Sequence, residues 1–175
     1  MTEQDGKPFL YAVVCAAGVA EGVSKLITAA QERDWEVGVI ATPLAMNGFF
    51  DTAAVEAQTG RPIRSAWRRP GDPRPFPPPD AVVVAPATFN TVNKWAAGMA
   101  DTLALGTLCE VSGLGIPIGV LPCVAGALAA HPAYGESLTR LRAMGVRIGD
   151  PYDGEAGVGG GRPEFRWERA LDLLG

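Results

Sequence analysis

The chain has 175 residues, of which 47% are hydrophobic, and this length and composition suit one compact domain, residues 1–175, with a well-formed core. Its net charge is −4 and no cluster of lysines or arginines is interleaved with aromatic residues, which argues against a nucleic-acid-binding surface. No stretch approaches the roughly 18 apolar residues that a membrane helix requires, and the polar start MTEQDGKPF lacks a targeting pattern. We therefore expect a soluble cytoplasmic protein with no nucleic-acid or membrane partner.

Short apolar runs alternate with longer segments of helical periodicity along the chain. Strands are predicted at 9–15, 36–42, 81–85 and 116–121, with weaker ones at 61–67 and 146–148. Helices are predicted from the first glycine-rich loop to about residue 33, at 43–58, at 89–111 (one or two helices), at 133–144 and at 164–174. Continuous apolar strands that alternate with helices indicate a doubly wound, Rossmann-like α/β fold, with a mainly parallel sheet covered by helices on both faces.

Two segments interrupt this alternation. Residues 67–80, WRRPGDPRPFPPPD, hold six prolines and are predicted to form a stiff extended loop. Residues 150–164, DPYDGEAGVGGGRPE, are rich in glycine and are interpreted as an active-site flap or as a linker to the last helix. A plain surface connection remains the alternative for both. Trp67, at the start of the proline-rich loop, is expected to cover a pocket or to anchor the loop.

The three cysteines do not indicate a disulfide framework or a metal site. Cys15, Cys109 and Cys123 are an odd number, widely spaced and set in apolar surroundings. We expect them to be reduced thiols with a structural role.

The loops after the predicted strands carry the candidate binding groups, because ligands of open parallel sheets lie at the carboxyl ends of the strands. After the first strand, AAGVAEG (16–22) has no bulky side chain and would let the backbone approach a phosphate, although a tight helix–strand turn explains it equally well. After the second strand, Thr42 offers a hydroxyl that is also consistent with an ordinary helix cap.

The segment PATFNT (86–91) follows the strand at 81–85. Pro86 is expected to end the strand's hydrogen bonding, and Ala87 keeps the approach open. Thr88, Asn90 and Thr91 then present hydroxyl and amide groups at a helix start, which is more than one cap needs. This surplus of polar groups favours a ligand.

PATFNTVNKWAAGMADTLA (86–104) resembles the PASANT-type motif and following helix of the homo-oligomeric flavin-containing cysteine decarboxylases. This flavoprotein family includes phosphopantothenoylcysteine decarboxylase and the peptidyl-cysteine decarboxylases of lantibiotic biosynthesis. The opening segment VVCAAGVAEGVSKLITAAQERDWEVGVIAT is similar to the family's first strand, loop, helix and second strand. LPCVAGALAAHPAYGESLTRLRAMGVRI resembles the segment that contains the substrate motif PxMNxxMW, and GEAGVGGGRPE resembles the family's flap, which ends in Gly-Arg.

The resemblance implies trimers, or dodecamers built from trimers, with FMN at the subunit interface. The first loop and Thr42 would meet the FMN phosphate, and PATFNT would line the isoalloxazine ring. In the family, the flavin oxidises the substrate's cysteine thiol to a thioaldehyde, and carbon dioxide is then lost. The implied FMN-binding residues are Ala17, Gly18, Val19, Thr42, Pro86, Ala87, Thr88, Asn90, Thr91 and Met99.

The catalytic position departs from the family pattern. The family's histidine precedes the strand that leads to PASANT, and counting back from Asp80 without gaps places that position at Asp72. Asp72 is thus the candidate catalytic residue, with a partner chain or an arginine of the proline-rich loop as alternatives. The only histidine, His131, is expected at a helix start. The alternative loop arginines are Arg68, Arg69 and Arg74.

The substrate motif departs as well. Ala125 stands where the family has the asparagine that holds the substrate carboxylate, Val124 and Leu128 replace its two methionines, and the flap cysteine is absent. The candidate substrate residues are Cys123, Val124, Ala125 and Arg162.

Three functional hypotheses stay open at this point. The first is an FMN-dependent oxidoreductase or decarboxylase-like enzyme that acts on a less polar small-molecule or peptide thiol, other than phosphopantothenoylcysteine. The second is a non-catalytic FMN-binding regulatory or assembly subunit. The third keeps the fold alone, with a different nucleotide or no ligand.

Overall fold

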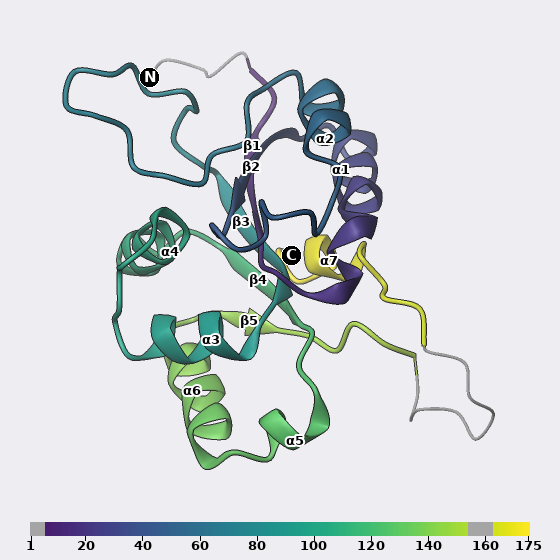
Figure 1. Cartoon of the computed structure of the whole chain (residues 1–175), viewed down its shortest axis with the longest axis vertical. Coiled ribbons are helices and arrows are strands. Elements are labelled where there is room, and N and C mark those ends of the chain that lie inside the picture. The colour runs from purple at the N-terminus through teal and green to yellow at the C-terminus, as the bar shows by residue number, and fades with distance from the viewer. Residues whose placement is uncertain (1–5, 154–162) are drawn as a thin grey trace.

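A computed structural model describes residues 6–153 and 163–175, and its centre is a five-stranded sheet in the order β2-β1-β3-β4-β5 (Figure 1). All four strand pairings are parallel. The predicted α/β fold is therefore confirmed. The chain runs from β1 outward to β2 and then returns to pair β3 on the other side of β1, so the direction of winding reverses between β1 and β3. The strands are β1 (Phe9–Val14), β2 (Glu36–Ala41), β3 (Ala81–Ala87), β4 (Ile118–Pro122) and β5 (Arg147–Ile148).

Helices cover both faces of the sheet. Alternate residues of β1 divide between two apolar clusters, with Leu10 and Val14 facing one side and Val13 facing the other. The first side carries the 3-10 helix η1 (Gly18–Gly22), α1 (Val23–Glu32), α2 (Thr52–Thr59) and α7 (Arg169–Asp172). The second side carries α3 (Phe89–Ala96), α4 (Leu103–Gly113) and α6 (Pro132–Ala143), with the short α5 (Gly126–Ala129) before α6.

The proline-rich segment takes the place of a helix beside α4. Residues 67–80 form neither helix nor strand, and Phe76 packs with its ring centroid 5.8 Å from that of Phe9. A Cβ at Gly38 of β2 would lie 2.8 Å from the Phe76 ring, so the glycine makes room for it. Tyr11 donates its hydroxyl proton to the Pro77 carbonyl over 2.7 Å. Single side chains thus hold this loop on the sheet.

The sequence predicted that the strand before PATFNT ends at Pro86, and this prediction is wrong. β3 continues to Ala87, with a register shift between Val84 and Ala87 that passes over the missing proline N–H. The Pro86 carbonyl still accepts a hydrogen bond from Cys15 N–H at 3.1 Å. A proline removes only a donor, so the acceptor side of the strand remains in use.

Three further elements are shorter in the structure than the sequence predicted. The helix predicted at 43–58 begins only at Thr52, because 43–48 form turns that include Gly48 with a φ of 83°. The strand predicted at 61–67 is a single bridge between Arg64 and Ile40. The helix predicted at 164–174 is reduced to α7. The segment 89–111 forms two helices, separated where Gly98 has a φ of 75°.

Within the described parts of the chain, no helix is both long enough and apolar enough to cross a membrane.

Candidate functional site

Three of the segments singled out in the sequence meet at the carboxyl edge of the sheet. Thr42 N–H donates to Val14 O at 3.0 Å, which places the end of β2 beside the end of β1. The Cys15 backbone N–H bonds Pro86 O, and its thiol donates to Thr91 Oγ1 at 3.4 Å. The candidate residues after β1, β2 and β3 are therefore neighbours.

Two of the polar groups in PATFNT are engaged within the chain. Thr88 is the N-cap of α3, where its hydroxyl oxygen accepts from Thr91 N–H at 3.4 Å. Thr91 is 5% exposed and turns toward Cys15. Asn90 is exposed, and its side chain makes no hydrogen bond within the described residues. The α3 N–H groups at Phe89 and Asn90 have no intrahelical acceptor either, because they belong to the first turn. Asn90 and this helix start are the groups best placed for a ligand.

Cys15 is a structural thiol beneath these residues. Burial raises the pKa of Cys15 above its ordinary value, and its hydrogen bonds with Thr91 and Thr88 offset part of that shift. The thiol is therefore protonated at neutral pH and acts as a donor to Thr91. It offers no nucleophile to the site.

The loop after β1 has one glycine that packing among the described residues does not explain. A Cβ at Gly22 would lie 3.0 Å from Trp167 Nε1, so the indole ring accounts for that glycine. Within residues 6–153 and 163–175, a Cβ at Gly18 would meet no atom within 4 Å, and the φ of Gly18 is not positive. Ala17 is buried and Val19 is half-buried beside it. An open backbone at Gly18 is what the approach of a ligand to this loop would require.

The remaining candidates for cofactor binding are less well placed. Thr42 Oγ1 accepts from Ala45 N–H at 3.3 Å, so it caps the turn at 43–48 rather than the helix start that the sequence predicted there. Met99 is 51% exposed and follows the carboxyl end of α3. Because α3 has eight residues and is about 12 Å long, Met99 is not brought to Thr88 within one chain.

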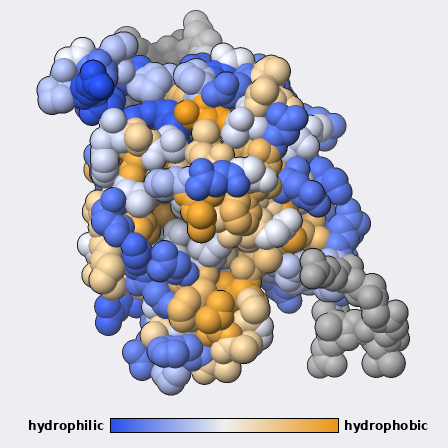
Figure 2. All heavy atoms as spheres, in the orientation of Figure 1, coloured by the Kyte–Doolittle hydropathy of each residue, from blue (hydrophilic) through white to orange (hydrophobic). Residues whose placement is uncertain are grey.

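The predicted substrate segment lies directly beside PATFNT. Cys123 N–H donates to Ala87 O at 2.8 Å, and Val124 follows it into a cleft of about 470 Å³ at the carboxyl ends of β4 and β5. Ala125 is exposed as the N-cap of α5. Figure 2 shows apolar side chains gathered at the end of the molecule that carries α5, where Leu128 is 47% exposed.

Two further residues line this cleft and were not predicted from the sequence. Tyr134 and Arg142 come from α6, and Arg142 is the only cation among the described residues that line it. The Phe89 ring stacks on Tyr134 with centroids 5.9 Å apart, which joins PATFNT to the cleft wall. Burial raises the pKa of Tyr134, and the charge of Arg142 acts in the opposite direction. No local pattern predicts this contact, because it depends on how α6 packs on α3.

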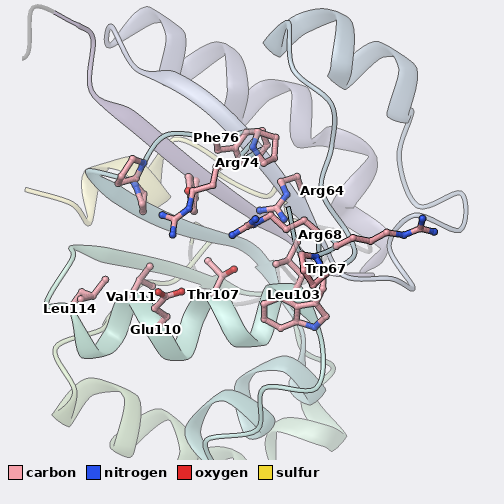
Figure 3. A pocket seen from close by; sticks show the side chains of 16 residues that line it. Arg64, Trp67, Arg68, Arg74, Phe76, Leu103, Thr107, Glu110, Val111 and Leu114 are labelled. Atoms are coloured by element: carbon pink, nitrogen blue, oxygen red, sulfur yellow. The ribbon is translucent and has the colours of Figure 1, made fainter. Parts of the chain in front are cut away.

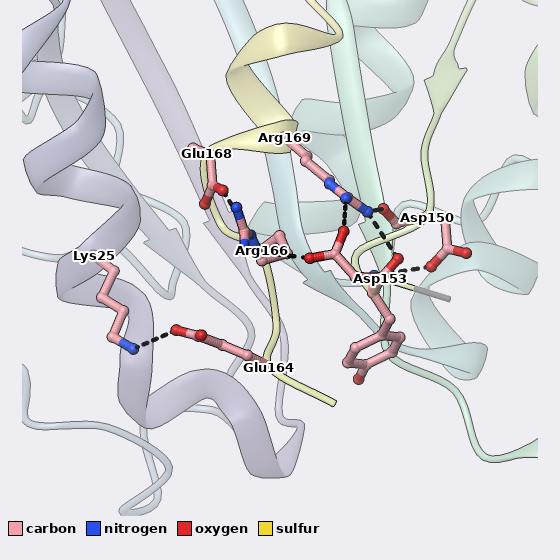
Figure 4. A network of polar contacts seen from close by, with 8 residues as sticks. Lys25, Asp150, Asp153, Glu164, Arg166, Glu168 and Arg169 are labelled. Carbon is pink, nitrogen blue, oxygen red and sulfur yellow. Dashed lines mark hydrogen bonds and ion pairs between the residues drawn. The ribbon is translucent and has the colours of Figure 1, made fainter. Parts of the chain in front are cut away.

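Ion pairs bring together the two ends of the glycine-rich segment (Figure 4). Asp153 bonds both Arg166, at 3.2 Å, and Arg169, while Glu164 reaches Lys25 of α1 at 3.4 Å. Tyr152, next to Asp153, lies with its hydroxyl 3.6 Å from the Cys123 thiol. The described residues on either side of 154–162 therefore lie close together, and Tyr152 at one of these ends lines the cleft. Most of the predicted flap, and Arg162 with it, belongs to residues 154–162, which lie outside the described residues.

The candidate catalytic position lies in an exposed turn. The Asp72 carboxylate accepts from Arg69 N–H at 2.8 Å, in the loop that leads to the amino end of β3. His131 is the N-cap of α6, as expected from the sequence, and its Nδ1 accepts from Ala133 N–H at 3.1 Å. The structure does not bring Asp72 to the PATFNT segment within one chain.

Comparison with known proteins fits this arrangement. The sequence model of the family described as Flavoprotein matches residues 2–162. The chain belongs to the flavoprotein family. Curated relatives include a cysteine/cysteine sulfinic acid decarboxylase from an unknown prokaryotic organism, which is 35% identical over 80 residues, or 46% of this chain and 21% of the relative. The coenzyme A biosynthesis bifunctional protein CoaBC of Thermococcus kodakarensis is 33% identical over 72 residues, or 41% of this chain and 18% of the relative. These matches span about a fifth of each relative's length.

Solved structures share the fold of this flavoprotein. The FMN-binding protein AtHal3 has a TM-score of 0.73 at 19% identity, covering 95% of this chain and 96% of its own. The cypemycin decarboxylase CypD has a TM-score of 0.73 at 21% identity, covering 97% and 92%. A PPC decarboxylase mutant complexed with pantothenoylaminoethenethiol has a TM-score of 0.69 at 21% identity, covering 88% and 87%. At these identities the likeness establishes the fold alone.

The residues at the carboxyl edge fit a flavin. The donors left free there are neutral, namely the first-turn N–H groups of α3 and the Asn90 amide, which suits both a phosphate at a helix start and ring carbonyls. In the described part of the flavoprotein, Asn93 Oδ1 is the one buried side-chain oxygen or nitrogen without a partner, and sequence analysis missed it. Asn93 lies three residues after Asn90, so the two share a face of α3. A donor from a ligand or a partner subunit would satisfy this oxygen.

Among the described residues, no group of acidic, histidine and cysteine side chains could hold a metal ion.

Proposed function

We propose that this flavoprotein binds FMN at the carboxyl edge of its sheet and acts on a thiol substrate other than phosphopantothenoylcysteine, as an FMN-dependent decarboxylase-like enzyme. The observation that carries this proposal is the bond from Cys123 N–H to Ala87 O, which joins the candidate cofactor segment to the cleft. The names of AtHal3, an FMN-binding protein, and CypD, a decarboxylase, support the same function.

In this proposal, Asn90 and the first turn of α3 hold the flavin, and the open backbone at Gly18 meets the phosphate. Met99 reaches the flavin of a neighbouring subunit, because within its own chain it lies beyond the far end of α3. This requirement supports a homo-oligomer, a trimer or a dodecamer of trimers, with FMN at the interface. When bound, the flavin would supply the electron acceptor for oxidation of the substrate thiol.

The cleft would position the substrate. Val124, Ala129 and Leu138 form an apolar wall that favours a less polar thiol than the family motif would hold. Ala125 has no side-chain amide to bind a substrate carboxylate, and the Arg142 guanidinium supplies a positive charge for it instead. In the assembly, Asp72 or an arginine of a partner's proline-rich loop would take the place of the family's histidine.

The test is anaerobic mixing of the FMN-loaded protein with a panel of thiols, including free cysteine and peptides that end in cysteine. We expect the flavin absorbance to fall and carbon dioxide to be released with an apolar cysteine-type thiol. Arg142→Gln should raise the KM for that substrate without loss of bound FMN, whereas Arg33→Gln, an exposed arginine paired with Asp172, should leave it unchanged. A panel in which no thiol lowers the flavin absorbance would contradict the catalytic part of the proposal.

A second candidate is a non-catalytic FMN-binding regulatory or assembly subunit. The observation that favours it is that His131, the only histidine, is engaged as a helix cap and that no histidine occupies the proline-rich loop. This candidate predicts a higher melting temperature with FMN than without it, and no carbon dioxide from any thiol.

A further inference from the structure

A pocket of about 650 Å³ lies between the proline-rich loop and α4 (Figure 3). Trp67 lines it and packs on α4 at Gly106, where a Cβ would overlap the indole ring, so the tryptophan anchors the loop. Because the proposed function places this loop at the flavin of a neighbouring subunit, the pocket is part of that site. The arginines next to and within α7 lie on the other face of the sheet and do not line this pocket.

Arg169 of α7 binds three groups of the chain that passes the cleft. Its guanidinium donates to the Asp150 carbonyl at 3.0 Å and to the Tyr152 carbonyl at 2.8 Å, and it pairs with the Asp153 carboxylate (Figure 4). Tyr152 N–H in turn donates to Asp150 Oδ1 at 2.9 Å. A planar guanidinium with several fixed donors suits such a contact, whereas a lysine ammonium acts as a point charge. One side chain therefore fixes the backbone around Tyr152.

The helix that carries Arg169 is itself held on the sheet. Its residues Ala170 and Leu171 are buried in the core. A Cβ at Gly119 of β4 would lie 2.6 Å from the Ala170 carbonyl oxygen, so this glycine lets α7 sit directly on the strand. The position of Tyr152 is thus set by the sheet, through α7 and Arg169.

Tyr152 lies at the end of the cleft that adjoins the candidate cofactor segment. Its side chain lines the cleft, and its hydroxyl lies 3.6 Å from the Cys123 thiol. Cys123 N–H bonds the carbonyl of Ala87, which belongs to PATFNT. The Tyr152 ring also meets the Phe165 ring edge to face, with centroids 5.8 Å apart. This residue therefore presents an aromatic ring and a hydroxyl where the cleft comes nearest to residues 86–91.

We propose that Tyr152 determines which thiols bind in the cleft and that Arg169 is the positioning residue that holds Tyr152 there. The inference rests on the proposed function for a thiol as the substrate. A thiol that enters toward residues 86–91 passes the Tyr152 ring, and a sulfur beside that of Cys123 meets the same hydroxyl. Arg169 is not among the described residues that line the cleft, so it acts through Tyr152.

The first experiment needs no substrate. It measures the rate at which iodoacetamide alkylates Cys123, by peptide mapping of the purified protein with and without FMN. Arg169→Gln should raise this rate several-fold, because Tyr152 would no longer be held beside the thiol. Tyr152→Ala, which leaves α7 intact, should raise it at least as much. Cys109 of α4, also half-buried, should keep its rate in both variants and is the internal control.

Arg166→Gln is the matched control variant. Arg166 pairs with the same Asp153 carboxylate at 3.2 Å and with Glu168 at 2.8 Å, but within the described chain its side chain bonds neither carbonyl that Arg169 binds. We expect the Cys123 rate to be unchanged in Arg166→Gln. Arg169→Lys keeps a charge near Asp153, should give an intermediate rate, and carries the test if Arg169→Gln does not fold.

The second experiment is turnover of the thiol that the FMN-loaded protein accepts. Arg169→Gln and Tyr152→Ala should each raise its KM about tenfold with little change in kcat and in bound FMN, because binding contacts are lost. Arg169→Lys should restore part of the KM, and Arg166→Gln should keep the wild-type value.

Equal Cys123 rates in wild type and Arg169→Gln, or the same rise in Arg166→Gln, would overturn the positioning role. An unchanged KM in Tyr152→Ala would overturn the specificity role. If no thiol is turned over, the substrate role of Tyr152 is lost together with the proposed function. The alkylation rates would still show whether Arg169 holds Tyr152, so the two failures are distinguished.

Discussion

Two neighbouring loops at the carboxyl edge of the sheet differ in chemical character. Residues 86–91 carry two threonines and an asparagine on a helix start that is bonded to the loop after β1. Residues 122–130 lie beside them through the bond from Cys123 N–H to Ala87 O, yet they carry no polar side chain except that thiol. We propose from this contrast that residues 86–91 serve a cofactor, whereas residues 122–130 are suited to a less polar substrate.

The largest effect is expected at Thr88. Thr88→Ala removes the N-cap of α3 and should cost about 1 kcal/mol of stability, and it should also weaken FMN by more than about tenfold, because the helix start would no longer be held in position. Thr102→Ala is the matched control, since Thr102 caps α4 in the same way by accepting from Leu105 N–H at 3.2 Å. Chemical denaturation and FMN titration measure the two quantities. Equal FMN affinity in the two variants would mean that the α3 start does not bind the cofactor.

A substitution at Asn90 should change FMN affinity without changing the free energy of unfolding. Asn90→Ala should weaken FMN by about tenfold, through the loss of one hydrogen bond to the ligand. The free energy of unfolding should stay within about 0.5 kcal/mol of wild type, because the exposed side chain bonds nothing else in the described chain. Unchanged FMN affinity would move the binding site away from this face of α3.

The pH dependence of stability tests whether the buried Cys15 thiol, which contacts Thr91, is protonated in the folded protein. The folded pKa of Cys15 is raised above the ordinary 9.0, so its contribution to stability is present below pH 9.0 and is lost as the pH rises through the folded value. Between pH 8 and pH 10, wild type should therefore lose more stability than Cys15→Ala. Parallel pH profiles of the two proteins would contradict the assignment.

The smallest effect is expected in the apolar loop. Ala125→Asn restores the amide of the family motif at an exposed N-cap, so we expect FMN affinity to be unchanged and stability to change by less than about 0.5 kcal/mol. Thiols with a free carboxylate should become better substrates than they are for wild type. If Ala125→Asn released FMN, the division between the two loops would be wrong.

The sequence predicted the sheet well because its strands are continuous apolar runs, such as AVVVA at 81–85, whose pattern needs no tertiary information. It mispredicted the role of Pro86, because a register shift lets the strand pass the missing donor. It also treated Thr91 as a ligand candidate like Asn90, since composition does not say which polar group turns inward to Cys15. Tyr134 and Arg142 went unnoticed because packing of α6, and no local spacing, brings them to the cleft.

The most direct test of the central claim, flavin binding through residues 86–91, is reconstitution with FMN followed by gel filtration with absorbance detection. Wild type and Thr102→Ala should elute as an oligomer that carries the flavin bands, and the double variant Thr88→Ala/Asn90→Ala should elute folded but colourless. A wild-type protein that retains no flavin, or a double variant that retains as much as Thr102→Ala, would contradict the claim.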